Sequence, residues 1–130
     1  MTIDLWLLVA TAILLPTLTI PVTFGRSRTK AGLQWGLGNR DTPYDVEPWV
    51  ARANRAHLNL LENLPTFAAL ILVAHAAGKA GAFTVLGAEI FFAARVAHAA
   101  VYLAGWTVIR TAVFILSLAG ELLILGDLIR

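Results

Sequence analysis

Four long apolar segments constrain this chain more than any other feature. They cover residues 3–24, 58–77, 82–105 and 106–129. Each approaches the roughly 20 residues that a helix needs to cross the hydrocarbon core of a bilayer. Of the 130 residues, 58% are hydrophobic, above the roughly 45–50% of a soluble domain. Little sequence remains for a soluble domain, so we expect residues 1–130 to form one all-α membrane domain.

The connections between these segments predict a four-helix antiparallel bundle. Glu47-Pro48 is typical of a helix start, because an acid and then a proline suit the first turn. Short turns at Gly78–Gly81 and Ala104–Trp106 make consecutive helices antiparallel neighbours. The expected helices are residues 3–24, 48–77, 82–105 and 107–129. The glycines and proline of the 25–47 connection predict irregular structure there.

The distribution of basic residues predicts how the bundle is oriented. The 25–47 connection is the most basic one and carries Arg26, Arg28, Lys30 and Arg40. Because basic loops stay in the cytoplasm, we expect this loop on the cytoplasmic side of the cell (inner) membrane. Four crossings then put both termini on the opposite side. Lys79 also lies on that side and is a single basic residue that does not follow the rule.

The composition also excludes several kinds of function. A net charge of +2 is too small to indicate nucleic-acid binding. The absence of cysteine excludes disulfides and thiolate metal sites, and no metal site is predicted. The first apolar segment has no Lys or Arg before it, so a spanning helix is a better interpretation than a signal peptide.

Polar residues inside the second helix form a stripe that needs partners. Arg52, Arg55, Asn59 and Glu62 follow one another at spacings of three and four, which places them on one helix face. An ionisable side chain in a membrane helix costs about 2.5–3.5 kcal/mol on insertion scales, so it normally faces a partner or a cavity. His57 points away from the stripe, and we interpret it as a hydrogen-bonding residue between helices.

The third and fourth helices bring further polar residues to the same level. Arg95, His98 and Tyr102 share one face of the third helix. Arg110 and Thr111 begin the fourth helix at the same side of the membrane. Such a cluster suits a small, multiply charged ligand, because arginines bind carboxylates in bidentate fashion and lower the pKa of a nearby thiol.

Less specific interpretations of these residues stay open. Glu62 could pair with Arg95 or Arg55 and only lock helices together, and Arg110 could extend to the lipid headgroups. No acid on the last helix lies near Arg110, which makes it the best candidate for function.

A second polar set lies toward the opposite membrane surface. It comprises His75, Glu89, Glu121 and Asp127. The two glutamates lie deeper, and they could share a proton or pair with His75. A proton relay is possible for such residues, but structural contacts are the favoured interpretation. The tryptophans, Trp35 among them, are expected at the membrane interfaces.

With these residues located, the chain resembles bacterial-type members of the MAPEG family, the membrane-associated proteins in eicosanoid and glutathione metabolism. The resemblance lies in the R-x-x-R-x-H-x-N-x-x-E pattern from Arg52 to Glu62, in Arg95-Val96-Ala97-His98 with Tyr102, and in Arg110-Thr111. It implies a homotrimer of four-helix subunits that binds glutathione between neighbouring subunits, in a pocket open to the cytoplasm.

The resemblance also assigns expected roles to individual residues. Arg110 matches the arginine that stabilises the glutathione thiolate, and Arg95 matches a residue that pairs with the helix-two glutamate. The expected glutathione contacts are Arg26 or Arg28, Arg55, Asn59, Glu62, Arg95, His98, Tyr102 and Thr111. The sequence departs from the family at Leu58, Leu60 and Phe114, where many members carry arginine, aspartate and tyrosine.

The resemblance therefore implies a glutathione-dependent transferase or peroxidase that acts on lipophilic electrophiles or lipid hydroperoxides beside the membrane lipids. The departures leave a second hypothesis, a non-catalytic scaffold of this type that binds an anionic lipid or another small anion. A third, a proton-coupled exporter, would depend on Glu89 and Glu121.

Overall fold

The computed structural model describes residues 1–130 and contains helices and no strands. The helices are α1 (Ile3–Thr17), α2 (Thr19–Ser27), α3 (Lys30–Leu37), α4 (Pro48–Ala76), α5 (Ala82–Ala104) and α6 (Thr107–Ile129). Four segments are long and apolar enough to cross a membrane: Ile3–Ser27, Pro48–Ala76, Ala82–Ala104 and Thr107–Ile129. The prediction of an all-α membrane bundle with four spans is confirmed.

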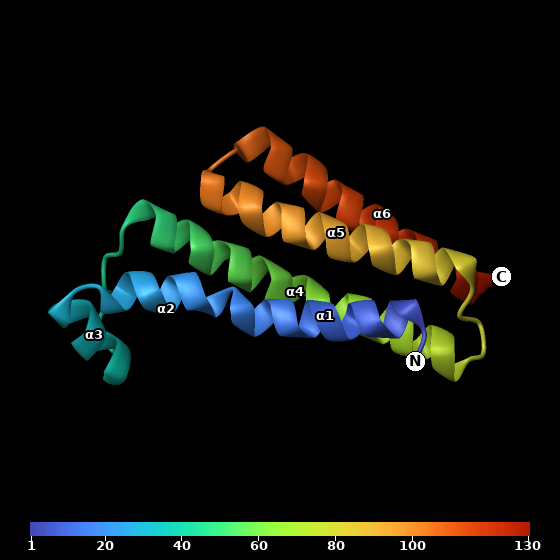
Figure 1. The fold of residues 1–130 in the computed structure, drawn as a ribbon, viewed down its shortest axis with the longest axis horizontal. Coiled ribbons are helices and arrows are strands. Elements are labelled where there is room, and N and C mark those ends of the chain that lie inside the picture. The colour runs from blue at the N-terminus through green and yellow to red at the C-terminus, as the bar shows by residue number, and fades with distance from the viewer.

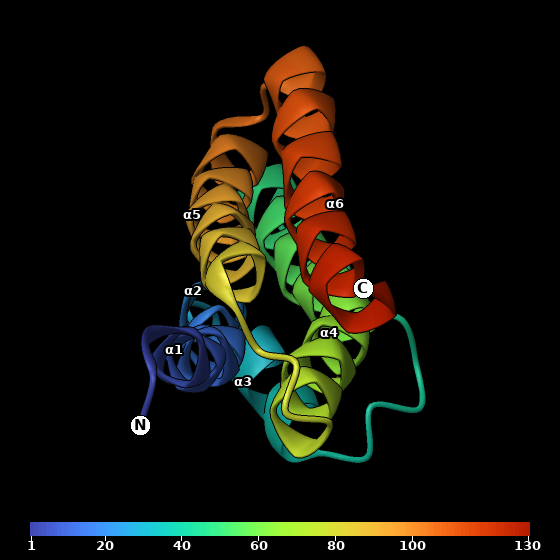
Figure 2. The same cartoon turned by 90° about the vertical axis from the view of Figure 1, so that its right-hand side faces the viewer.

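The spanning helices pack in two layers. α1 and α2 lie along α4 in one layer, and α5 and α6 form an antiparallel hairpin in the other (Figures 1 and 2). Both chain termini lie at one end of the bundle, whereas α3 and the loop after it lie at the other end (Figure 1). The turn between α5 and α6 lies toward the α3 end.

The first span is interrupted at Leu18, between α1 and α2. Pro16 and Pro21 flank this position, and a proline cannot donate a hydrogen bond to the carbonyl four residues before it. Beside the break, Thr19 Oγ1 donates to the Pro16 carbonyl at 2.7 Å. The span also runs to Ser27, three residues beyond the expected end at residue 24.

The prediction of irregular structure throughout residues 25–47 was wrong, because this connection contains α3. Thr29 caps that helix by accepting a hydrogen bond from the Gly32 amide at 3.0 Å. Gly32 allows α3 to pack on α2, since a Cβ there would lie 2.1 Å from the Arg26 carbonyl oxygen. The glycines that indicated a loop thus permit a close helix contact.

Capping contacts fix the ends of the spanning helices. The Asp127 carboxylate, near the end of α6, accepts hydrogen bonds from the Thr84 amide and hydroxyl at 2.8 and 3.0 Å, at the N-terminus of α5. Gly105 ends α5 in the left-handed conformation, with φ of 82°. Arg52 Nε donates to the Leu103 carbonyl at 3.1 Å and so ties α4 to the end of α5.

α5 and α6 approach each other most closely where two glycines meet. A Cβ on Gly87 would lie 2.4 Å from the Gly120 carbonyl oxygen, and a Cβ on Gly120 would lie 2.6 Å from that of Gly87. Small residues allow such backbone contact in lipid, where van der Waals packing holds helices together. Beside this contact, the Phe67 and Phe91 rings stack 4.0 Å apart and link α4 to α5.

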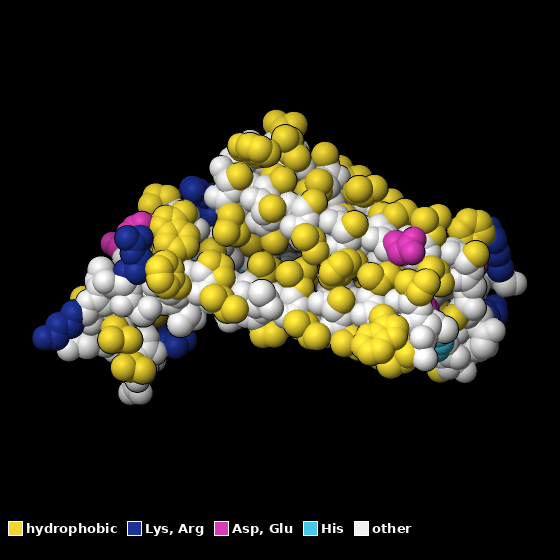
Figure 3. Space-filling model, viewed as in Figure 1, with side chains coloured by type: hydrophobic (Ala, Val, Ile, Leu, Met, Phe, Trp, Pro, Cys, Tyr) yellow, Lys and Arg dark blue, Asp and Glu magenta, His cyan; other side chains and the backbone are white.

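The visible surface agrees with membrane insertion. Lys and Arg side chains gather at the two ends of the molecule, and the middle is largely hydrophobic (Figure 3). Large apolar side chains such as Ile13, Leu72 and Leu122 are exposed on it. An apolar band of this kind suits contact with lipid chains.

Candidate functional site

A cavity of about 270 Å³ lies between α4, α5 and α6, near the turn that joins α5 to α6. It is lined by Asn59, His98, Tyr102, Arg110, Thr111 and Phe114. Five of these six residues were predicted to form the site. They meet because α5 ends and α6 begins at the same side, at the level where Asn59 lies on α4.

Arg110 is the central cation of this cavity. Its Cζ atom lies 4.8 Å from the centroid of the Tyr102 ring, close enough for a cation–π interaction. The two ion pairs of the structure are Arg28–Glu47 and His75–Asp4, so Arg110 has no carboxylate partner within the chain. Its side chain lines the cavity, where it is half-buried.

Arg95 is buried beside the cavity and contacts two of the residues that line it. Its Nη1 donates to Asn59 Oδ1 at 2.8 Å, and its Cζ lies 5.1 and 5.3 Å from the rings of Phe91 and Phe114. Its Nε and Nη2 are buried without hydrogen-bond partners. Glu121 of α6 lies near enough for its charge to act on Arg95, but the two side chains do not form an ion pair. Two buried guanidinium donors are therefore left without hydrogen bonds.

The expected pairing of Glu62 with Arg95 or Arg55 does not form within the chain. Arg95 bonds to Asn59 instead, which lies three residues earlier on α4. Glu62 and Arg55 are both exposed on the outer face of that helix. A charged residue that faces outward from a membrane helix normally has a partner or polar surroundings outside that helix.

Phe114 forms the apolar side of the cavity. Its ring centroid lies 6.3 Å from that of His98, whereas the His98 ring meets the Tyr102 ring edge-on at 5.3 Å. The departure from the family pattern at this position thus removes a hydroxyl from the cavity itself. Leu60 is buried and Leu58 is exposed, and neither lines the cavity.

The two arginines at the end of the first span lie outside this cavity. Arg28 is exposed and has a long 4.0 Å contact with Glu47. Arg26 instead lies against Trp35 of α3, with its Cζ 5.2 Å from the ring centroid. Within one chain, the structure does not bring either residue to Arg110.

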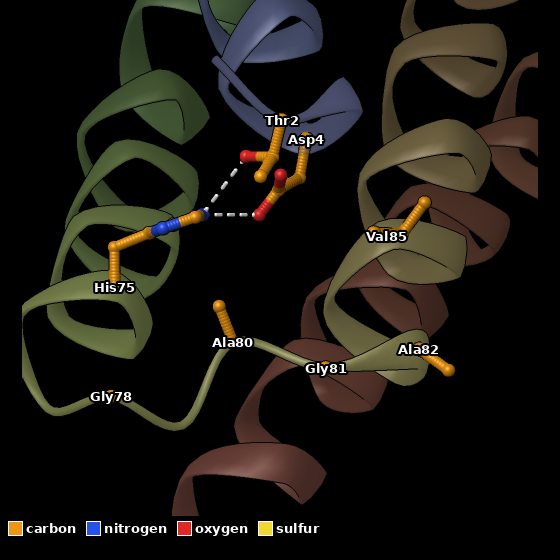
Figure 4. Close-up of a pocket in the computed structure, with 8 residues that line it drawn as sticks. All are labelled: Thr2, Asp4, His75, Gly78, Ala80, Gly81, Ala82 and Val85. Carbon is orange, nitrogen blue, oxygen red and sulfur yellow. Dashed lines mark hydrogen bonds and ion pairs between the residues drawn. The ribbon is translucent and has the colours of Figure 1, made fainter.

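The other end of the bundle holds a polar pair that sequence reasoning missed. Asp4 is 1% exposed, and its Oδ2 lies 2.6 Å from His75 Nε2 (Figure 4). The pair borders a cavity of about 410 Å³ and joins the first turn of α1 to the last turn of α4. A lone acid at the start of an apolar segment was the only available signal. The pairing of His75 with Glu89 or Glu121 that was considered possible does not form, because His75 pairs with Asp4. Glu89 is exposed, and Glu121 is buried in α6.

His57 has the packing role that was predicted for it. Its Nδ1 lies 3.1 Å from the Leu15 carbonyl oxygen, so it joins α4 to the last part of α1. This contact lies beside the proline-flanked break in the first span.

Fold and cavity together define a polytopic helical membrane protein with a cationic pocket among its last three helices. The chain matches the MAPEG family over residues 5–129, and it belongs to that family. Members of the family are glutathione-dependent transferases, peroxidases or related proteins, typically trimeric and embedded in a membrane. A comparison with curated proteins gives no significant match.

Proposed function

We propose that this protein is a glutathione-dependent transferase or peroxidase that acts on lipophilic electrophiles or lipid hydroperoxides at the membrane. The observation that carries the proposal is Arg110, a cation in a cavity with no carboxylate partner in its own chain. An unpaired cation in a membrane helix normally faces a partner or a water-filled cavity, and an anion bound in this cavity would supply the partner.

The residues present fit glutathione, a tripeptide with two carboxylates, an amine and a thiol. The Arg110 guanidinium in the cavity suits an anionic group of the tripeptide. Asn59, Tyr102 and Thr111 add polar groups around the cavity. Its volume of about 270 Å³ lies just below the roughly 300–1,000 Å³ of complete ligand pockets, which suits a site that a neighbouring subunit completes.

Bound glutathione would supply a thiol that forms a sulfur–carbon bond with an electrophile as the leaving group departs. The guanidinium of Arg110 would favour the thiolate, because an adjacent positive charge stabilises the ionised form. The Tyr102 ring orients Arg110 through the cation–π contact. Phe114 and the outward-facing surface of α6 would admit the apolar partner from the lipid.

The exposed charges on α4 support the proposal of a homotrimer. Arg55 and Glu62 are exposed on α4, a helix long and apolar enough to span a membrane, and neither forms an ion pair within the chain. A neighbouring subunit that packs on this face would bury them and bring a helix-one arginine toward the cavity. Arg28 is the better candidate for that role, because Arg26 already lies against Trp35. The membrane is proposed to be the inner membrane, with the α3 end in the cytoplasm.

Equilibrium binding of glutathione to the purified protein tests the proposal. Arg110→Gln keeps a polar side chain that can donate hydrogen bonds and removes the charge, so we expect binding to weaken by about tenfold or more, the worth of a charge-assisted hydrogen bond. Arg130→Gln removes an equal charge from the exposed C-terminus and is expected to bind as the wild type does. Undetectable binding by the wild type, or equal binding by Arg110→Gln, would contradict the proposal.

Phe114 favours one alternative, a non-catalytic scaffold whose pocket binds an anionic lipid or another small anion. In that case anionic lipid, and not glutathione, would compete for the Arg110 pocket. The same binding measurement with added phosphatidylglycerol separates the two proposals.

A further inference from the structure

The Asp4–His75 pair borders the largest cavity of the bundle, at the end that carries the chain termini (Figure 1). The cavity measures about 410 Å³, and its other lining residues are Thr2, Gly78, Ala80, Gly81, Ala82 and Val85. Asp4 is 1% exposed, whereas the His75 side chain is 27% exposed. The carboxylate and the imidazole point toward each other at the edge of this cavity (Figure 4). Water and protons therefore reach the histidine more easily than the carboxylate.

The pair holds the first turn of α1 against the last turn of α4. Asp4 is the second residue of α1, and the residue before it, Ile3, is 58% exposed. The packing of α1 on the hydrophobic core begins at Leu5. Asp4 Oδ2 lies 2.6 Å from His75 Nε2, and Thr2 Oγ1 lies 3.4 Å from the same nitrogen. The polar contacts of this turn thus converge on one imidazole.

The charge of His75 decides whether the buried carboxylate has a countercharge. Imidazole is the side chain whose charge ordinarily changes between about pH 5 and about pH 8. A protonated His75 forms an ion pair with Asp4. A neutral His75 can still form a hydrogen bond, but it leaves the carboxylate buried without an opposite charge, which is costly. Because Asp4 lies at the end of its span, a small outward movement of this turn would hydrate the carboxylate.

No other charged group replaces His75 in this contact. The remaining charged groups toward this end of the bundle are the Met1 amine, Lys79, Glu89, Asp127 and Arg130. Lys79 donates to a carbonyl at the end of α6, Asp127 accepts hydrogen bonds at the start of α5, and Arg130 lies over a ring of α5. Glu89 is exposed further along α5, and neither it nor the Met1 amine forms an ion pair.

We propose that the Asp4–His75 pair is a proton-sensitive switch. With His75 protonated, the pair holds the first turn of α1 against α4 and keeps the cavity closed on that side. When His75 releases its proton to water, this turn loosens and the cavity widens toward α1. The switch lies at the opposite end of the bundle from the Arg110 cavity, and it does not depend on glutathione binding or catalysis.

Electron paramagnetic resonance of a spin label on the first turn of α1 tests the proposal. The chain contains no cysteine, so Ile3→Cys gives the full-length protein a single attachment site. In lipid nanodiscs, we expect the mobile fraction of the label to rise by about twofold or more between about pH 5 and about pH 8. A change of this size is what a weak, partly exposed ion pair can supply. An unchanged mobile fraction would overturn the proposal.

Two variants in the Ile3→Cys background assign the response to the pair. His75→Gln can still donate a hydrogen bond but cannot change its charge, and Asp4→Asn removes the carboxylate. We expect the mobility of the label to be independent of pH in both variants. A response that persists in either variant would come from another titrating group and would overturn the proposal.

His57→Gln is the matched control, because His57 also joins α1 to α4 but contacts the uncharged Leu15 carbonyl. We expect this variant to keep the pH response of the label at position 3. A label on Ile129→Cys, 77% exposed at the end of α6, should show no response. Loss of the response in His57→Gln, or an equal response at position 129, would show a general loosening of the bundle and would overturn the switch.

Discussion

At the scale of single residues, the polar side chains without partners indicate the ligand site more directly than the paired ones do. Arg110 has no carboxylate partner, and Arg95 keeps two buried donors free. Arg110 lines the cavity, and Arg95 bonds to Asn59, which also lines it. Desolvating an unpaired charge is costly, and an anionic ligand in the cavity would offset that cost for Arg110.

A substitution at Phe114 is expected to raise the affinity for glutathione. Phe114→Tyr adds a hydroxyl to the cavity that Arg110 and His98 also line, and one further hydrogen bond is worth about 1 kcal/mol. We therefore expect glutathione to bind about fivefold more tightly, as measured by titration calorimetry. Phe83→Tyr is a control on an exposed ring at the other end of α5, outside the cavity lining, and it is expected to bind as the wild type does. Unchanged or weaker binding by Phe114→Tyr would contradict the role given to this position.

The Asp4–His75 pair is expected to contribute to stability. His75→Ala leaves the carboxylate of Asp4 buried without its partner, and a stranded buried charge is strongly destabilising. Because the His75 side chain is 27% exposed, we expect a loss of about 2 kcal/mol, less than the full cost of breaking a buried pair. Thermal unfolding in detergent measures it. The same substitution in an Asp4→Asn background should cost clearly less, and an equal cost in both backgrounds would mean that the pair is not coupled.

The position of a side chain could be predicted from the sequence where helix periodicity determines the face on which it lies. Arg95, His98 and Tyr102 recur at spacings of three and four, so their common face follows from α5 alone, and Arg110 follows from the short turn into α6. The partner of each residue was less predictable, because a shift of one turn decides whether Arg95 meets Glu62 or Asn59. Asp4 and His75 are 71 residues apart, and no local pattern relates them.

At the scale of helices, the contact between α5 and α6 holds the cavity together. Gly120→Ala would place a Cβ 2.6 Å from the Gly87 carbonyl oxygen, which is backbone and cannot rotate away. We expect a loss of stability of about 1–3 kcal/mol, as for other overpacked contacts. Gly126→Ala lies on the same helix with no neighbouring atom within 4 Å.

Thermal unfolding of the two variants side by side checks this prediction. Gly126→Ala is expected to match or slightly exceed the wild type, because alanine has the higher helix propensity. Similar melting temperatures for the two variants would show that α5 and α6 do not meet as closely as described.

Hydropathy and turn residues predicted the spanning helices to within a few residues, because a helix that crosses a bilayer needs a minimum length and an apolar surface. α3 was not predicted, since it is short and its glycines resemble those of a loop. They are needed for tertiary contact with α2, and such contacts are not visible in local sequence. The flanking prolines account for the interruption at Leu18.

At the scale of the whole molecule, the end that carries α3 and the Arg110 cavity is expected to face the cytoplasm. The chain contains no cysteine, so single-cysteine variants report topology without background. A membrane-impermeant maleimide should label Asp41→Cys only from the cytoplasmic side and Arg130→Cys only from the other side. Both positions are exposed, and labelling in the reverse pattern would invert the orientation and place the cavity opening away from cytosolic glutathione.

The central claim is that Arg110 stabilises a bound thiolate in the cavity between α4, α5 and α6. Ultraviolet absorption of the thiolate, followed as pH is raised with glutathione bound to the purified protein, tests it most directly. We predict that bound glutathione ionises at a clearly lower pH than free glutathione, whose thiol resembles the free cysteine thiol with its pKa of about 8.5. We also predict that Arg110→Gln abolishes the difference. Ionisation of bound glutathione at the same pH as free glutathione in the wild type would contradict the account.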